Sequence, residues 1–205
     1  FEEVLAYNRA GKGGVLHIGH FNNWEVLGLA AGYIFDKMAF VARPQANKYV
    51  DAELTKMRVS TGSVMVNSYN PFFSSFKLLK KGYMIGILSD QSVITTSSLY
   101  MNFLGRPAEV PPMSAVLALK LRLPIFPVKS RREGGKLIIT AQAPILPGDT
   151  PYSDEAVTAL TAKLYQEYES WIKENPSSWL WAHNRWKREA RVKKIMDAQE
   201  GKSHE

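Results

Sequence analysis

One short segment, residues 19–25 (GHFNNWE), carries residue types and spacing that suit acid–base chemistry. An apolar, strand-like run ends just before it, and an apolar helical pattern begins at its end. Asn22 or Asn23 is expected to cap that helix, which places Glu25 in the first turn with its carboxylate directed back at His20. A carboxylate bonded to one ring nitrogen fixes the tautomer and raises the basicity of the other nitrogen. The pair therefore suits removal of a proton from a hydroxyl.

The same segment is also consistent with a capped helix that follows an incidental histidine, and the residues alone leave both interpretations open. The N–H groups at the helix start, near Asn22 and Asn23, suit binding of an oxyanion or a phosphate. The chain has no Gly-x-Ser-x-Gly motif and no cysteine, so it lacks the common nucleophile motif, thiol chemistry and disulfides. A base without a covalent nucleophile suggests direct transfer from an activated donor to an acceptor hydroxyl.

The chain has four histidines, which supply a metal site poorly, and we expect none. His17 lies three residues before His20 in the strand-like run, so the two rings are expected to face opposite sides of a sheet. We expect His17 in the core, His183 in a structural role, and His204 idle in a polar tail.

The apolar pattern alternates between short β-rich runs and longer helical runs. Strands are expected at 15–18, 38–42, 64–66, 84–88, 125–128 and 137–140, and helices at 24–35, 49–61, 72–81, 113–121 and 154–175. This alternation predicts an α/β domain with a largely parallel central sheet flanked by helices. Ligands bind such sheets beyond the carboxyl ends of the strands. His20, Arg43 and Asp90 each follow a predicted strand, so they are expected on one rim.

The 205 residues suit one domain, and their net charge of +7 is unevenly distributed. Two basic clusters stand out, at 185–194 and at 120–136. Such clusters suit anionic lipid headgroups, an acidic carrier protein or nucleic acid, although a solvated face gives the same pattern. No nucleic-acid-binding motif is present, so we expect no nucleic-acid partner. No run is apolar and long enough to span a membrane. Because the sequence begins at Phe1 rather than Met, we expect it to be a fragment of a longer chain.

Five further blocks occur in a fixed order along the chain. They are 42–48 (ARPQANK), 89–91 (SDQ), 103–108 (FLGRPA), 124–128 (PIFPV) and 179–187 (WLWAHNRWK). Together with the His-x4-Glu spacing of His20 and Glu25, they resemble the bacterial lipid A biosynthesis acyltransferases of the lauroyl/myristoyl type, in the lysophospholipid acyltransferase superfamily. The sequence departs from that pattern at Ser92, where the family has a second acidic residue, and at Asn184, where it usually has arginine.

The resemblance implies a fold like that of glycerol-3-phosphate acyltransferase, with an acyltransferase domain over 1–188 and a basic helix or tail over 189–205. It implies His20 as the general base and Glu25 as its partner. The substrate-binding residues it implies are Asn22, Asn23, Arg43, Arg58, Asp90 and Arg106; Asp90 either orients the site or only caps its strand. Glu109 is a weaker candidate for a third acidic or substrate-facing residue.

The implied reaction moves a fatty acyl group from an acyl thioester, on acyl carrier protein or coenzyme A, to a hydroxyl of a lipid A precursor. It needs no cofactor, and its place is the cytoplasmic face of the inner membrane. Members of the family usually carry an N-terminal membrane segment, so the resemblance implies such an anchor upstream of this sequence, or peripheral binding to the membrane. Two alternatives stay open. One is acylation of another lipid, such as a phosphatidylinositol mannoside or a lysolipid, and the other is a non-catalytic lipid-binding domain on the same scaffold.

Overall fold

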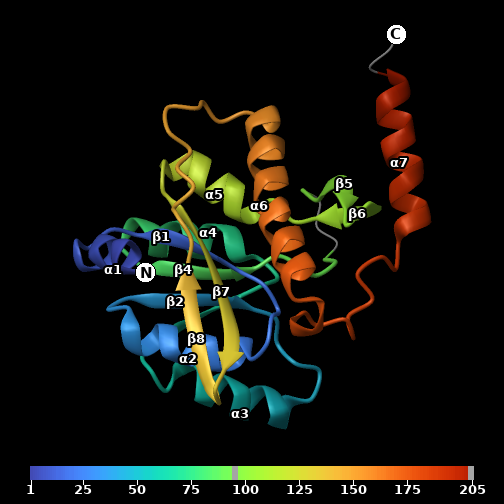
Figure 1. Cartoon of the computed structure of the whole chain (residues 1–205). Coiled ribbons are helices and arrows are strands. Elements are labelled where there is room, and N and C mark those ends of the chain that lie inside the picture. Colours follow the sequence, from blue (N-terminus) through green and yellow to red (C-terminus); the bar gives the residue numbers. More distant parts are fainter. Residues whose placement is uncertain (94–96, 203–205) are drawn as a thin grey trace.

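The computed structural model describes residues 1–93 and 97–202. Its centre is a six-stranded sheet in the order β3-β2-β4-β1-β7-β8, with helices on both faces (Figure 1). These strands are β1 (Gly14–Ile18), β2 (Met38–Ala42), β3 (Val64–Asn67), β4 (Met84–Leu88), β7 (Ile125–Glu133) and β8 (Lys136–Ala141). Only β8 runs antiparallel, as the hairpin partner of β7, while the other neighbours pair in parallel. The predicted α/β fold with a largely parallel sheet is confirmed.

The helices are α1 (Glu2–Arg9), α2 (Trp24–Ile34), α3 (Lys48–Val59), α4 (Pro71–Lys80), α5 (Met113–Leu121), α6 (Asp154–Glu174) and α7 (Glu189–Lys202), with a 3-10 turn at Pro176–Ser178. Side-chain caps start several of them where the sequence predicts. Asn23 accepts a bond from the Val26 amide at 3.1 Å, and the hydroxyl of Ser153 accepts one from the Ala156 amide at the same distance. None of the described helices combines the length and apolar character needed to cross a membrane.

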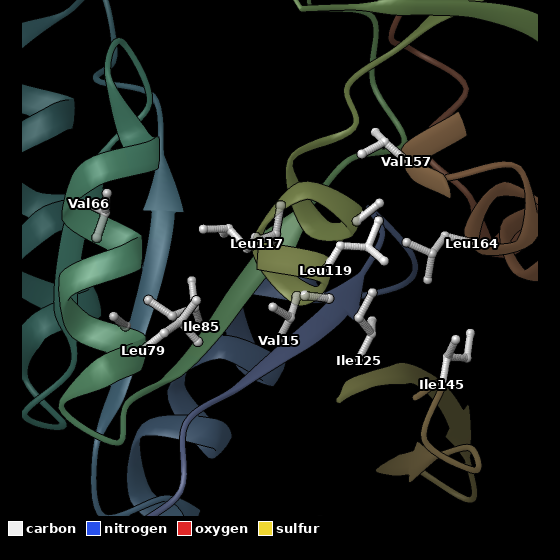
Figure 2. Packing of buried hydrophobic residues seen from close by; sticks show 14 residues of the cluster. Val15, Val66, Leu79, Ile85, Leu117, Leu119, Ile125, Ile145, Val157 and Leu164 are labelled. Carbon is white, nitrogen blue, oxygen red and sulfur yellow. The ribbon is translucent and has the colours of Figure 1, made fainter. Parts of the chain in front are cut away.

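The two faces of the sheet bury alternate residues of the same strands. Val15 and Ile85 pack with α4, α5 and α6, and Figure 2 shows Leu117 of α5 beside them. Leu16 and Met84 face the opposite way and pack with α1 and α2. Burial on both faces explains why the strand runs are almost continuously apolar.

A two-stranded hairpin, β5 (Leu99–Phe103) and β6 (Arg106–Val110), was not among the expected elements. Its turn places both Leu104 and Gly105 at positive φ, which agrees with the tight turn that Gly105 suggests. Phe103 and Val110 bury against an aromatic cluster supplied by α6 and the segment that follows it. Helix α7 lies alongside this hairpin (Figure 1).

Candidate active site

His20 and Asp90 meet at the carboxyl end of two adjacent strands. β1 and β4 pair in parallel with Ile18 opposite Leu88, so both chains leave the sheet at the same level. Two residues later, His20 Nδ1 lies 2.8 Å from Asp90 Oδ1, and the His20 amide donates to Asp90 Oδ2 at 3.0 Å. The rim expected at the carboxyl ends of the strands therefore brings together a histidine and a carboxylate.

Glu25 does not contact His20, and the prediction that it orients the imidazole is wrong. Its carboxylate accepts two bonds from Arg58, one from Nε at 3.0 Å and one from Nη2 at 2.5 Å. Glu25 does lie in the first turn of α2, but it faces α3 rather than the strand end. A guanidinium offers a carboxylate two charge-assisted bonds, which is a stronger partner than an imidazole that Asp90 already holds. The bond to Glu25 raises the pKa of Arg58, which stays charged.

Asp90 is fully buried and ionised. Burial alone raises the pKa of this carboxyl, but hydrogen bonds from His20 and from the Trp179 indole outweigh it and hold the pKa below its ordinary value. An ionised carboxylate accepts, so His20 Nδ1 carries a proton and Nε2 keeps its lone pair. The His20 side chain is 18% exposed, with the Trp24 ring edge-on at 5.1 Å between centroids. Part of the His20 side chain is therefore open to solvent.

The hydroxyl groups of two tyrosines of α6 form hydrogen bonds at the carboxyl ends of β1 and β4. Tyr168 donates to the carbonyl of Ile18 at 2.6 Å and accepts from the amide of Ser89 at 3.2 Å. Tyr165 donates to the carbonyl of Ser89. These contacts fix the residues that immediately precede the loops carrying His20 and Asp90.

His17 is buried next to this support, as expected for a core residue. Its ring stacks on Tyr168 at 4.2 Å, and its Nε2 donates to the carbonyl of Leu164 at 3.2 Å. Burial lowers its pKa to about 4, so the ring is neutral at physiological pH. His204 lies outside the described residues.

Asn22 and Asn23 both shape the loop between His20 and α2. Asn22 adopts a left-handed φ of 49°, and its side chain donates to the carbonyl of Ser130. Its amide donates to the carbonyl of Ser178 at 2.7 Å, so this one of the amides near the helix start is already engaged. Asn23 caps α2 through its side chain. The amides of Trp24 and Glu25, in the first helical turn, have no intrahelical acceptors.

Arg43 and Arg58 line one pocket of about 150 Å³, between the ends of β2 and β3 and helix α3. Arg43 is exposed, and Asn67, Asp51 and Thr55 supply other polar walls. The structure thus groups the two arginines that were expected to bind an anion. It does not bring Arg106 to them: that guanidinium pairs with Glu189 of α7, with Nε at 3.2 Å, and lies 4.6 Å over the Trp186 ring.

The comparisons with known proteins identify the family. The sequence matches the family described as "Bacterial lipid A biosynthesis acyltransferase" over residues 1–188. The chain belongs to this family. Comparison with individual curated proteins gave no match. Membership makes the chain a lipid A-type acyltransferase, which implies an acyl donor and a lipid A-type acceptor.

The segment after α6 contributes contacts to His20 and Asp90 that the spacing of acid–base residues in the sequence does not indicate. The Trp179 indole donates to Asp90 Oδ2 at 2.8 Å, and the amide of Leu180 donates to the carbonyl of His20 at 3.0 Å. His183 accepts from the amide of Ser92 at 3.0 Å, in keeping with its expected structural role. The signal in the sequence was the 179–187 block, one of the five that carry the family resemblance.

A buried charge network ties this segment to the β5–β6 hairpin. Glu109 is buried and accepts from Arg188 Nε at 2.6 Å, while Arg188 Nη2 donates to the hydroxyl of Ser92 at 2.7 Å. Arg185, also buried, donates to the carbonyl of Glu109 at 2.7 Å. Ser92 thus occupies the family's second acidic position as a neutral acceptor for arginine. Within the described residues, no group of three histidine or carboxylate side chains is arranged to hold a metal ion.

Proposed function

We propose that this acyltransferase moves a fatty acyl group from an acyl thioester to a hydroxyl of a lipid A precursor, with His20 as the general base. The observation that carries the proposal is the bond from His20 Nδ1 to the buried Asp90 carboxylate at 2.8 Å. In the neutral ring this bond places the proton on Nδ1 and leaves a lone pair on Nε2, and the negative charge of Asp90 stabilises the imidazolium that forms when Nε2 takes a proton.

In the proposed reaction, the acceptor hydroxyl lies at His20 Nε2 and loses its proton as its oxygen attacks the thioester carbonyl. The carbonyl becomes a tetrahedral oxyanion, for which the proposed donors are the amides of Trp24 and Glu25, which have no intrahelical acceptors. The C–S bond then breaks, the ester forms, and the proton on His20 passes to the departing thiolate. Atoms and charge balance without a metal or a redox cofactor.

The acceptor's anionic group is proposed to bind in the pocket lined by Arg43 and Arg58. Lipid A precursors are anionic glycolipids, and guanidinium forks suit phosphate or carboxylate groups. In this arrangement Glu25 acts through Arg58, because its two bonds hold that guanidinium against the pocket wall.

The donor carrier is proposed to be acyl carrier protein or coenzyme A, and the working surface the cytoplasmic face of the inner membrane. Exposed basic side chains support both parts of the proposal. On the β7–β8 hairpin they include Arg132 and Lys136, and on α7 Arg191, Lys193 and Lys194. An acidic carrier or an anionic headgroup layer is attracted to such surfaces.

Mass spectrometry of lipids from cells that contain or lack the full-length protein tests the proposed reaction. We expect the acceptor lipid to be lighter by one acyl chain in the cells that lack it, and complementation with wild type, but not with His20→Ala, to restore the mass. An unchanged lipid A profile, or a mass change in another lipid class, would contradict the proposed acceptor.

A further inference from the structure

The indole of Trp179 is one of three N–H donors that surround the buried Asp90 carboxylate. Oδ1 accepts from the His20 ring at 2.8 Å, and Oδ2 accepts from the His20 amide at 3.0 Å and from Trp179 Nε1 at 2.8 Å. The indole bond differs from the other two because it comes from a segment 89 residues away in the chain. It is also the only one of the three that a side-chain substitution outside His20 and Asp90 removes.

The segment that carries Trp179 is fastened directly to the loop that carries His20. Phe21 and Trp179 form an antiparallel bridge, flanked by bonds from the Asn22 amide to the Ser178 carbonyl at 2.7 Å and from the Leu180 amide to the His20 carbonyl at 3.0 Å. The indole itself is buried, with the rings of Phe103 and Trp186 around it at about 6 Å between centroids. Its N–H group is therefore held in one direction, toward Asp90.

We propose that Trp179 is a positioning residue for the acyl-transfer reaction, which fixes the Asp90 carboxylate and through it the tautomer and proton affinity of His20. This inference rests on the proposed function for its kinetic meaning. The substrate does not touch Trp179, because its indole lies in the aromatic cluster beneath the pair. The site thus depends on a second segment that closes over the His20 loop after α6.

The substitution Trp179→Phe removes the N–H donor and keeps an aromatic ring in the cluster. With one donor fewer, Asp90 directs more negative charge at His20, which stabilises the imidazolium. We expect the His20 ring to titrate at a higher pH in the variant than in wild type, because one of the three donors that share the charge of the carboxylate is gone. We expect the acidic limb of the kcat profile to move by the same amount, with the KM of the donor unchanged.

Other titratable groups surround His20 and Asp90, and their titrations must be distinguished from that of His20. His17, Tyr165 and Tyr168 face Asp90 from beneath, and His183 lies near both His20 and Asp90. Burial keeps His17 neutral down to a pKa of about 4 and keeps both tyrosines protonated. Burial and nearby cations lower the pKa of His183, so His183→Gln is needed to assign the ring signals.

The test is an NMR titration of labelled histidine rings in the full chain, carried out on wild type, Trp179→Phe and Trp181→Phe. Trp181→Phe is the matched control, because its indole donates to the Pro176 carbonyl in the same segment and stays 51% exposed. Phenylalanine also keeps an aromatic ring at this position, where the Trp181 ring packs edge-on against Trp179 at 4.7 Å between centroids. A raised His20 titration in Trp179→Phe alone supports the inference. Equal titrations in wild type and Trp179→Phe, or equal shifts in both variants, would overturn it.

A second measurement decides the matter if Trp179→Phe fails to fold. In wild type, the indole proton of Trp179 is expected to shift with pH in step with the His20 ring, and the Trp181 proton is expected not to. An invariant Trp179 proton would overturn the inference. Neither NMR measurement requires substrate, so a positive result without acyl transfer would reject the proposed function and leave the coupling between Trp179 and His20 intact.

Discussion

Replacing Asp90 by asparagine is expected to reverse the tautomer of His20. The carboxylate accepts from three donors, two on Oδ2 and one on Oδ1. An amide has a single acceptor oxygen, which satisfies most donors when it faces the His20 amide and the Trp179 indole. Its NH₂ group then faces Nδ1 of His20. Nδ1 must accept, the proton moves to Nε2, and the nitrogen that faces the substrate no longer has a lone pair.

The magnitude follows from the bond that is lost. A hydrogen bond to a charged group contributes about 1.5–3 kcal/mol, which corresponds to a loss of roughly 10- to 150-fold in rate. The wrong tautomer adds to this, so we expect kcat for Asp90→Asn to fall at least about 100-fold. The assay is acyl transfer from lauroyl and myristoyl thioesters, together with nitrogen NMR of the His20 ring, which distinguishes the two tautomers.

Glu25→Gln is the informative comparison, because local sequence spacing favours Glu25 as the partner of His20. In Glu25→Gln we expect the tautomer and the titration of His20 to match those of wild type. Any loss of transfer is expected to equal that of Arg58→Gln, and the double variant is expected to lose no more than either single variant. A changed His20 tautomer in Glu25→Gln, together with an unchanged one in Asp90→Asn, would refute the assignment of Asp90 as the partner.

Three further predictions concern stability and acceptor binding. Burial lowers the pKa of His17 from 6.5 to about 4 in the folded protein. Between these two pH values the unfolded chain binds a proton at His17 and the folded protein does not. The free energy of unfolding therefore decreases as the pH falls from about 6.5 toward 4. Urea unfolding is expected to show about 2 kcal/mol less stability at pH 5 than at pH 7 from this group, a difference that disappears in His17→Phe; an equal slope in the variant would contradict the assignment. Arg43→Ala is expected to raise the KM of the anionic acceptor about fivefold with kcat nearly unchanged, and a fall in kcat alone would place Arg43 elsewhere. Asn23→Ala and Asn47→Ala each remove a helix cap and are expected to cost about 1 kcal/mol in urea unfolding; no loss in either would show that the caps are not formed.

The sequence predicts the sheet well because its central strands are buried on both faces. Apolar runs between turn residues locate β2 and β4 with the bounds that the structure has. Because His20 and Asp90 each follow a strand of a largely parallel sheet, the sequence also places them on one rim. The β5–β6 hairpin escapes the pattern. Pro107 interrupts its second strand, and its buried residues pack on aromatic rings from α6 and the following segment rather than on the main sheet.

The partner of His20 was not predictable from local spacing. Glu25 lies in the expected helical turn, but Arg58, more than 30 residues later, competes for its carboxylate. Asp90 comes from a strand 70 residues away, and sequence gives no measure of which rim carboxylate faces the ring. Trp179 reads as a core residue, and it is one; only the direction of its N–H group, set by the bridge to Phe21, reveals the second role.

The most direct test of the proposed chemistry is acyl transfer by the purified protein, followed by mass spectrometry of the lipid product. Wild type is incubated with lauroyl or myristoyl thioesters of coenzyme A or acyl carrier protein and with a lipid A precursor, beside His20→Ala. We predict a product heavier by one acyl chain with wild type and essentially none with His20→Ala, while both proteins unfold at similar urea concentrations. Transfer by folded His20→Ala at the wild-type rate would contradict His20 as the general base.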